Sequence, residues 1–336
     1  MIGEALSSQV QVIKSEANFN NEIGVPMTLL GIRPGDQVAV LEVAMRGKGQ
    51  IASLCQFIRP TIGVVTNIGP AHYELLGSLE AIESAKAELV EALPENGCAV
   101  LNADDERCRR IASRTRARVA FYGMSPEAEY RAQDVVVESS GRTYFRCLAG
   151  DLELDVSIPL PGYHNVRNAL AALAVAGFLG LDLESAARSL SRAKITGMRL
   201  EFMDVRGMKV INDAYNANPD SMAASLSVLG AVGSGRRVAI LGDMLELGDY
   251  SREGHLSVGR KAAESGTDLL IALGPQAKDI AEGALEGGMN RKSVVWFASK
   301  EEARTELVSL LKPGDTVLVK ASRGMRLEEV IDWLKR

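Results

Sequence analysis

Residues with the chemistry to hold a metal ion or a polar ligand lie within or just after two apolar runs in the first half of the chain. Glu42 lies inside the run 37–44, where a carboxylate costs free energy unless it is paired or metal-bound. Asn67 lies near the end of the run 62–68, and His72 follows that run. The alternatives are that a nearby amide or lysine satisfies Glu42, and that His72 is an ordinary loop residue. Both interpretations stay open at this point.

Lys86 has an unusual place on the helix expected over residues 78–93. At about 100° per residue it lies at the centre of the apolar stripe. That stripe consists of Leu79, Ile82, Leu89, Val90 and Leu93. The polar side of the helix is expected to carry Glu80, Glu88 and Glu91. A lysine reaches water less easily from the middle of a helix than from its end. Because buried lysines become nucleophilic or open to modification, we favour a functional role.

A second group of polar residues opens the alanine-rich helix expected at about residues 165–179. His164, Asn165 and Asn168 lie at its start. The spacing of three places the amides of Asn165 and Asn168 on one face, where they could contact a ligand. Capping of the helix is the alternative for Asn165. Both roles are compatible with the sequence.

The segment DAYNANPDSM, residues 213–222, joins an apolar strand to a helix. Asn218 is a good N-cap and Pro219 suits the first helical position, so these two residues are explained by turn formation. Asp213, Tyr215 and Asn216 are not explained in that way. Ligands bind beyond the carboxyl ends of parallel strands, and these three side chains are therefore candidates for a ligand contact.

Arg199 ends the segment that we expect to link two domains. It could bind an anionic ligand from that position. Glu201 follows two residues later, however, and a solvated ion pair between the two side chains is the alternative interpretation.

The elements that would position these residues form two series. Short apolar strands alternate with amphipathic helices, which indicates parallel sheets covered on both faces. The strands are expected at 10–14, 37–44, 62–68, 98–102 and 117–123, and then at 209–214, 236–243, 268–274, 293–297 and 315–322. Residues 134–160 alternate with period two and predict a small antiparallel meander. Helices at about 165–179 and 183–193 follow it.

We therefore expect an α/β protein with two doubly wound parallel-sheet domains, the first carrying the meander. The boundary is expected near residues 195–199, which gives domains of residues 1–195 and 196–336. A chain of 336 residues that is 46% hydrophobic is large enough for two cores.

Composition argues against several classes of partner. The net charge is −5 and no basic block occurs, so nucleic acid is not expected as a partner. The longest apolar stretch, 169–181, is too short to cross a bilayer, and we expect no membrane insertion. The first residues lack the pattern of a signal peptide. Four scattered cysteines fit reduced thiols, and together these features predict a cytoplasmic protein.

Eight segments, taken together and in order, resemble the Mur ligase family. They span nearly the whole chain, and DAYNANPDSM with NNEIGVPMTLL is typical of the members that add D-alanyl-D-alanine. The segments cover residues 18–30, 40–52, 66–72, 85–97, 160–172, 213–222, 241–248 and 319–325.

The resemblance implies an ATP-dependent amide ligase of peptidoglycan precursor synthesis. Such an enzyme joins D-Ala-D-Ala to UDP-MurNAc-tripeptide through an acyl phosphate, with Mg²⁺ as the second cofactor. By position, Glu42 and His72 resemble the magnesium ligands. Lys86 resembles the lysine that relatives carry as a carbamate, which makes it an anionic metal ligand. His72, Lys86 and Arg199 would be the catalytic residues of a monomer.

The resemblance also assigns residues to the nucleotide and to the other substrates. Asn165 and Asn168 resemble contacts to adenine, and Arg199 resembles a phosphate contact. Asp213, Tyr215 and Asn216 correspond to the ribose region. The residues that resemble substrate contacts are Asn20, Asn21, Asn67, Lys320, Ser322 and Arg323.

The sequence departs from the family at one motif. The family binds the ATP phosphates with a GxxGK[ST] loop, and residues 46–50, RGKGQ, do not match it. By this pattern we expect the chain to start inside the helix after that loop, and we expect little or no ligase activity from it alone. The alternatives are a non-catalytic remnant or binding module of the same fold, and a ligase with another acceptor, such as a folylpolyglutamate or polyamino-acid ligase.

Overall fold

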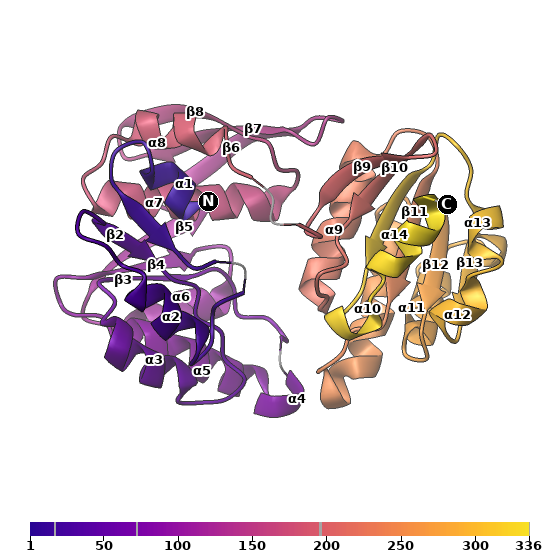
Figure 1. The fold of residues 1–336 in the computed structure, drawn as a ribbon, viewed down its shortest axis with the longest axis horizontal. Coiled ribbons are helices and arrows are strands. Elements are labelled where there is room, and N and C mark those ends of the chain that lie inside the picture. The colour runs from indigo at the N-terminus through magenta and orange to yellow at the C-terminus, as the bar shows by residue number, and fades with distance from the viewer. Residues whose placement is uncertain (17, 72, 195–196, 336) are drawn as a thin grey trace. The chain divides into compact units, whose positions relative to one another are not determined.

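Apolar strands and amphipathic helices alternate along the chain and form two units (Figure 1). The computed structural model describes residues 1–16, 18–71, 73–194 and 197–335. The first unit comprises described residues within 1–69, 75–136 and 142–194. The second comprises those within 70–74 and 137–141, together with residues 197–335.

The first unit contains a sheet of six strands in the order β3-β4-β5-β6-β7-β8. These strands are β3 (Ile62–Val65), β4 (Cys98–Asn102), β5 (Arg118–Gly123), β6 (Tyr130–Val137), β7 (Thr143–Ala149) and β8 (Leu152–Ile158). Strands β3 to β6 pair in parallel, whereas β7 and β8 pair antiparallel. The parallel sheet and the small antiparallel portion are as predicted. Strand β6 begins four residues earlier than the predicted meander, because its start pairs with the end of β5.

Two further strands of this unit form a separate parallel pair, β1 (Val12–Lys14) and β2 (Val38–Val40). Both are shorter than the runs that predicted them. The prediction that Glu42 lies inside a strand is wrong, because β2 ends two residues before it. Glu42 is exposed on the loop that follows.

Helices pack around the six-stranded sheet. Helix α7 contacts β4 and β5 and lies against α1 and α8, whereas α5 contacts β3 and lies against α3 and α6 (Figure 1). The helices are α1 (Ile2–Leu6), α2 (Gly24–Leu30), α3 (Gln50–Ile58), α5 (Leu79–Glu91), α6 (Glu106–Ile111), α7 (Tyr163–Phe178) and α8 (Leu183–Leu190), and a 3₁₀ turn, η1 (Ala112–Arg114), follows α6. Helix α4 (Tyr73–Leu76) has residues in both units. The alanine-rich sequence of α7 suits its buried place, because small side chains allow close approach to the strands.

Glu88 differs from its prediction as a polar-side residue of α5. It is only 7% exposed, and its carboxylate accepts hydrogen bonds from the backbone N–H groups of Gly49 (2.6 Å) and Ala52 (3.0 Å). These amides belong to the amino-terminal end of α3, where free N–H groups favour an anion. The carboxylate of Glu88 therefore caps a neighbouring helix and ties α3 to α5.

The second unit contains a sheet of six strands in the order β13-β12-β11-β14-β10-β9. The strands are β9 (Glu201–Val205), β10 (Met208–Asn212), β11 (Arg237–Gly242), β12 (Leu269–Leu273), β13 (Val294–Phe297) and β14 (Thr316–Lys320). All neighbours pair in parallel except β9 and β10. Strand β9 was not predicted. A two-residue turn with positive φ at Arg206 (53°) and Gly207 (75°) folds it back onto β10.

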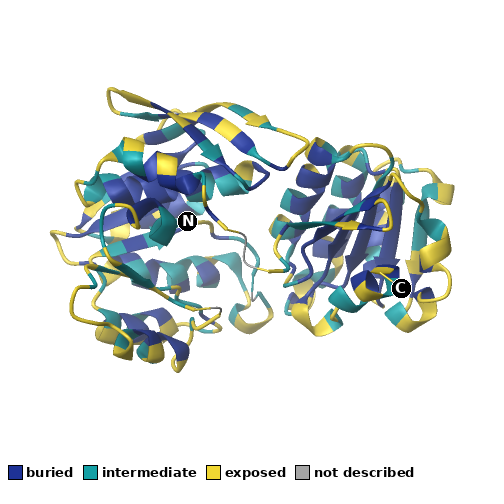
Figure 2. Ribbon diagram, turned by 45° about the horizontal axis from the view of Figure 1, so that its top comes forward, coloured by how far each residue is buried: buried dark blue, intermediate teal, exposed yellow. Residues whose placement is uncertain are grey.

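Alternate residues of the central strands enter two separate cores. In β12, Leu270 and Ala272 belong to one apolar cluster, whereas Ile271 and Leu273 belong to the other. Figure 2 shows these strands as buried along their length. The helices and 3₁₀ turns of this unit are α9 (Pro219–Val232), η2 (Gly248–Tyr250), α10 (Ser251–Glu264), α11 (Ala277–Glu286), η3 (Arg291–Ser293), α12 (Lys300–Ala303), α13 (Leu307–Leu310), η4 (Arg323–Met325) and α14 (Glu328–Lys335). Helices α9 to α11 cover one core and α12 to α14 the other, which is the doubly wound arrangement predicted.

Replacement of Glu88 by alanine is expected to destabilise the first unit. The change leaves the amides of Gly49 and Ala52 without their acceptor, at a cost of roughly 1–2 kcal/mol. Urea unfolding of Glu88→Ala measures the loss. The matched control is Glu91→Ala on the same helix, which removes only the half-exposed ion pair with Arg114. We expect that control to change stability by less than about 0.5 kcal/mol, and equal losses in the two variants would contradict the capping role.

Candidate active site

Glu42 and Asn20, predicted separately as metal and substrate residues, lie together. The Asn20 side-chain amide donates to Glu42 Oε1 over 3.0 Å, and the Ser15 hydroxyl accepts from the Glu42 backbone N–H over 3.2 Å. The alternative of an acid satisfied by a nearby amide is thus observed. Asn21 instead accepts the N–H of Gly24 at the start of α2, over 2.9 Å. These bonds shape the loops after β1 and β2.

Lys86 and Asn67 are also brought together. The Lys86 ammonium donates to the backbone carbonyl of Asn67 over 2.6 Å. Ser78 caps the helix that carries Lys86 by accepting from the Ala81 N–H. Lys86 is half-buried, so its head group reaches the edge of the apolar stripe and is not enclosed by it. The helix thus directs this amine to the loop that follows β3.

Two acidic or amide side chains that sequence reasoning missed hold the same loop. Asn102 donates to the carbonyl of Thr66 over 2.9 Å, and Asp105 accepts from the N–H of Ile68 over 2.7 Å. Asp105 also caps α6, where it accepts from the N–H groups of Arg107 and Cys108. The segment NADD after a buried strand could have indicated this role, since such residues often satisfy backbone groups in turns. The loop around Asn67 is therefore fixed by the end of β4.

The predicted metal ligands are only partly covered by the structure. His72 lies outside the described residues. Among the residues that are described, no group of three or more His, Cys, Asp or Glu side chains could hold a metal ion. The chemistry of the donors still fits Mg²⁺ at Glu42, because its carboxylate is exposed and Mg²⁺ prefers such oxygens. An uncharged or protonated Lys86 amine does not fit, whereas a carbamate would.

Asn165 and Asn168 lie one turn apart at the start of α7. The N-cap of this helix is Gly162, whose φ of 94° lies in the left-handed region, so the capping alternative for Asn165 is wrong. The Asn165 side chain donates to the Pro161 carbonyl over 2.8 Å. Asn168 is partly exposed and forms no hydrogen bond through its side chain with any described residue.

Asp104 holds the same helix end and was not predicted. It accepts from Arg167 Nε over 2.7 Å and from the N–H groups of Met124 and Ser125. Burial alone would raise the pKa of this carboxyl, but the bonds from Arg167 and the two amides reverse the effect and lower it. A side chain at Gly123 would collide with Asp104, since its Cβ would lie 2.6 Å from Oδ1. The ion pair ties α7 to the ends of β4 and β5.

In the second unit, Asp213 and Lys320 form a buried ion pair. Asp213 directly follows β10, and Lys320 is the last residue of the neighbouring strand β14. Lys320 Nζ lies 2.6 Å from Asp213 Oδ2. Lys320 is 3% exposed and Asp213 is 7% exposed. Burial lowers the pKa of Lys320, and the adjacent Asp213 partly opposes this. The direct ligand contacts predicted for both residues remain predictions.

Arg199 and Tyr215 contact each other beside this pair. The Arg199 guanidinium lies 4.5 Å from the centroid of the Tyr215 ring, in a cation–π contact. The predicted alternative of an ion pair with Glu201 is wrong, because Glu201 accepts instead from the N–H of Met198 and the side chain of Asn212. Among the described residues Arg199 makes no ion pair, and it is exposed.

Ser322 and Arg323 follow β14 with different environments. Ser322 is 4% exposed, and its hydroxyl accepts from the Leu245 N–H over 2.8 Å. Arg323 is exposed and pairs with Glu328 over 2.8 Å. Asn216 is exposed as well, next to Tyr215. Exposed cationic and amide groups therefore border a buried, fully bonded layer at this edge of the sheet.

Comparison with known proteins identifies the family. The family "Mur ligase middle domain" matches residues 1–176, and "Mur ligase, glutamate ligase domain" matches residues 198–323. The first match alone covers 176 of the 336 residues.

The chain belongs to the Mur ligase family.

Two relatives show how far the similarity to individual Mur ligases extends. The UDP-N-acetylmuramoyl-tripeptide–D-alanyl-D-alanine ligase of Bacillus subtilis (strain 168) is 38% identical over 333 residues, which cover 98% of this chain and 71% of that protein. The enzyme of the same name from Escherichia coli (strain K12) is 35% identical, over 100% of this chain and 73% of that protein. The sequence resemblance is thus confirmed at the level of the family.

Solved Mur ligase structures share the fold. Crystal structure I of MurF from Acinetobacter baumannii matches with a TM-score of 0.91 and 30% identity, covering 100% of this chain and 73% of that one. MurF from Thermotoga maritima in complex with ADP matches with a TM-score of 0.87 and 27% identity, covering 99% of this chain and 75% of that one.

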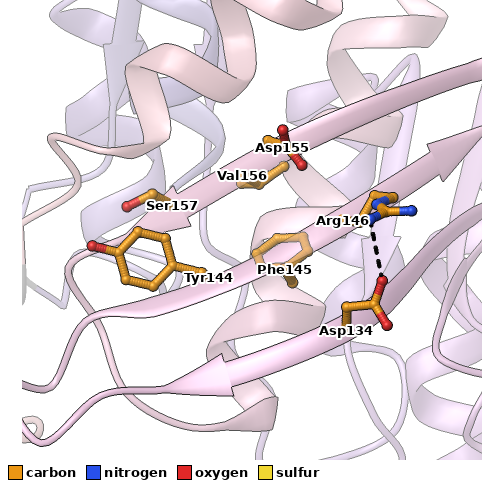
Figure 3. A pocket seen from close by; sticks show the side chains of 7 residues that line it. All are labelled: Asp134, Tyr144, Phe145, Arg146, Asp155, Val156 and Ser157. Atoms are coloured by element: carbon orange, nitrogen blue, oxygen red, sulfur yellow. Dashed lines mark ion pairs between the residues drawn. The ribbon is translucent and has the colours of Figure 1, made fainter.

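One pocket of this Mur ligase lies apart from the predicted residues. It has a volume of about 470 Å³ and lies on β6, β7 and β8 (Figure 3). Its lining residues are Asp134, Tyr144, Phe145, Arg146, Asp155, Val156 and Ser157. Figure 3 shows Arg146 directed toward Asp134, with which it pairs over 3.5 Å. None of the residues predicted for the site lines it.

In the described part of the chain, no helix has the length and apolar character needed to span a membrane.

A buried histidine supports the LGDMLELG segment, residues 241–248, and was also missed. His255 is 0% exposed, and its Nε2 accepts the N–H of Met244 over 3.0 Å. Its Nδ1 lies 2.7 Å from the Ser251 carbonyl and therefore carries the proton. Burial lowers the pKa of His255, although the bond to Ser251 and the charge of Asp243 oppose this. The geometry requires a neutral imidazole.

His255 is expected to make stability depend on pH below about 6.5. Its folded-state pKa is lowered, so the unfolded chain takes up a proton first as the pH falls. The contribution of His255 is therefore complete above the unfolded pKa and is lost as the pH falls toward the folded pKa. Urea unfolding at pH 7, 6 and 5 is expected to show wild-type stability falling more steeply than that of His255→Gln.

The variant Ser257→Ala provides the control for this measurement, because it alters the same helix without removing a titratable group. It is expected to keep the wild-type dependence of unfolding on pH. Parallel curves for wild type and His255→Gln would show that the imidazole does not titrate with folding.

Proposed function

We propose that this chain provides the nucleotide-binding and C-terminal parts of an ATP-dependent ligase that adds D-Ala-D-Ala to UDP-MurNAc-tripeptide. In this proposal, residues 1–195 form the ATP-binding domain and residues 196–336 form the C-terminal domain. The observation that carries the proposal is the continuous match, over 98% of the chain, to a relative with that name. The ADP complex of a similar protein supports the nucleotide.

The reaction explains the types of residue that the site requires. A carboxylate is a poor electrophile, so phosphoryl transfer from ATP first converts the terminal carboxyl of the tripeptide into an acyl phosphate. The amine of D-Ala-D-Ala then attacks the acyl carbon, the new C–N bond forms, and inorganic phosphate leaves as the amine loses a proton. Negative charge on the phosphoryl oxygens must be stabilised by fixed cations.

In the first unit, we propose that Glu42 binds Mg²⁺ together with His72 and a carbamate on Lys86. The metal ion would neutralise charge on the phosphoryl oxygens. The exposure of the Glu42 carboxylate and the direction of Lys86 toward the loop of Asn67 support these assignments. Asn20, held against Glu42, would contact the muramyl peptide with Asn21 and Asn67. Asn165 and Asn168 would contact adenine from the partly exposed start of α7.

In the second unit, we propose that Arg199 binds phosphate. Its exposure, its contact with Tyr215 and the absence of an ion pair among the described residues support this role, since a guanidinium without a protein anion is available to a ligand. Tyr215 and Asn216 would contact the nucleotide, and Arg323 the peptide substrate. We further propose that the protein is a monomer. We also propose that it is cytoplasmic, because ATP and nucleotide-activated substrates are available in the cytoplasm.

Replacement of Arg199 by alanine is expected to weaken ADP binding to this chain about tenfold, which corresponds to about 1.4 kcal/mol. The loss arises because alanine cannot make the charge-assisted phosphate contact. Titration calorimetry with and without Mg²⁺ measures the affinity. Arg252→Ala, which removes a cation of the same unit with a 70% exposed side chain, is the control and is expected to bind ADP as wild type does. Equal affinities of Arg199→Ala and wild type would remove Arg199 from the site.

Replacement of Lys86 by alanine is expected to abolish D-Ala-D-Ala-dependent ADP release in the chain extended to the length of its relatives. Short-chain carboxylates are expected to restore turnover, because they supply the oxygen ligands that a carbamate would provide. Glu80→Ala on the same helix serves as the control and should retain turnover. Full turnover by Lys86→Ala would rule out the proposed role of this lysine.

A further inference from the structure

The backbone on both sides of Arg199 is strained. Met198 has a φ of 57° and Leu200 a φ of 51°, and neither is a glycine. Residues of this kind in the left-handed region cost free energy and persist only where surrounding contacts determine the conformation. Arg199 lies between them, so the direction of its side chain depends on whatever holds these two residues.

Hydrogen bonds to the ribose-region segment hold the strained residues. The Leu200 N–H donates to Asp213 Oδ1 over 3.1 Å, and the Met198 carbonyl accepts the Tyr215 N–H over 3.1 Å. The Met198 N–H also donates to Glu201 over 3.2 Å. Two of these three bonds end on the segment Asp213–Tyr215. The orientation of Arg199 is therefore coupled to the position of that segment.

Lys320 fixes the same segment from the neighbouring strand. Its ammonium donates to Asp213 Oδ2 over 2.6 Å and to the Asn216 carbonyl over 2.9 Å. The Ser225 hydroxyl lies 2.5 Å from Asp213 Oδ2 and completes the set of donors around this carboxylate. With Leu200, Ser225 and Lys320 as donors, Asp213 has both oxygens occupied within the protein. Lys320 is itself buried, with 3% of its surface exposed.

We propose that Lys320 is a positioning residue, which acts through Asp213 to hold Arg199, Tyr215 and Asn216 in place for the nucleotide. The ammonium neutralises the buried carboxylate, and the carboxylate in turn holds the strained backbone of Leu200. Loss of Lys320 leaves the buried carboxylate of Asp213 without its cation. The carboxylate then turns toward solvent and releases Leu200. This inference rests on the proposed function for the identity of the ligand, but the positioning itself does not.

Hydrogen–deuterium exchange of the whole chain tests the positioning without any ligand. In Lys320→Met, peptides covering residues 198–203 and 213–217 are expected to exchange at least tenfold faster than in wild type. Peptides covering β12 report on the core of the same sheet. Their exchange rates are expected to change only if the global stability changes. The matched control is Arg236→Met, which breaks the ion pair between the partly exposed Arg236 and the buried Asp315 at the opposite end of this sheet. This control is expected to leave unchanged the ratio between the exchange rates of peptides 198–203 and 213–217 and the exchange rate of β12.

A double variant separates positioning from general loss of a buried ion pair. In Asp213→Asn with Lys320→Met, the asparagine oxygen can still accept from Leu200, and no unpaired charge remains. Exchange at residues 198–203 is therefore expected to return to within about threefold of wild type. If Lys320→Met does not fold, Lys320→Gln, which retains a donor, takes its place. Either folded single variant with wild-type exchange ratios overturns the proposal.

ADP affinity, measured on the same variants, relates the positioning to the nucleotide. Lys320→Met is expected to weaken ADP binding at least fivefold, whereas Arg236→Met should stay within twofold of wild type. If wild type does not bind ADP, the proposed function fails while the exchange experiment still decides the inference. If wild type binds ADP and Lys320→Met binds it equally well, the inference is wrong and the proposed function stands.

Discussion

The parallel pairing of strands is the constraint on which the candidate site depends. It brings the carboxyl ends of neighbouring strands to one edge of the sheet, so loops far apart in sequence meet there. In the second unit, β10 and β14 are more than a hundred residues apart, and yet Asp213 and Lys320 meet at their ends. A buried carboxylate or a buried ammonium alone would be costly, and each is tolerated because the other is present. The pair therefore joins the ends of the two strands.

Many of the polar side chains at these edges serve the protein's own backbone. Asn21 and Asp105 satisfy helix amides, Asn102 satisfies the carbonyl of Thr66, and Ser322 accepts from Leu245. Loops that carry many polar backbone groups can hold one conformation only if those groups are bonded. The exposed residues Glu42, Arg199, Asn216 and Arg323 are thereby presented on rigid supports. Such preorganisation reduces the entropy lost when a ligand binds.

Prediction from sequence succeeded where burial is reflected in residue type. Strands buried on both faces consist of continuous apolar runs, and β4, β11, β12 and β14 were located within one or two residues. It failed where a side chain is satisfied by a distant segment. The helical pattern places Glu88 on the face expected to be exposed to solvent, but its carboxylate accepts hydrogen bonds from the free amides of α3. Strand β9 was missed because its pairing with β10 depends on a two-residue turn whose signal is weak in sequence.

The sequence by itself determined the alternation of strands and helices, the doubly wound class, and the candidate residues whose types match the family motifs. These features depend on local hydrophobic pattern and on the order of motifs, both of which a single chain displays. Only the tertiary structure decided which candidates lie together, which are exposed, and which have their polar groups hydrogen-bonded within the protein. Asn20 meets Glu42, Lys86 meets Asn67, and Lys320 meets Asp213 because backbone pairing sets distances that no local pattern encodes.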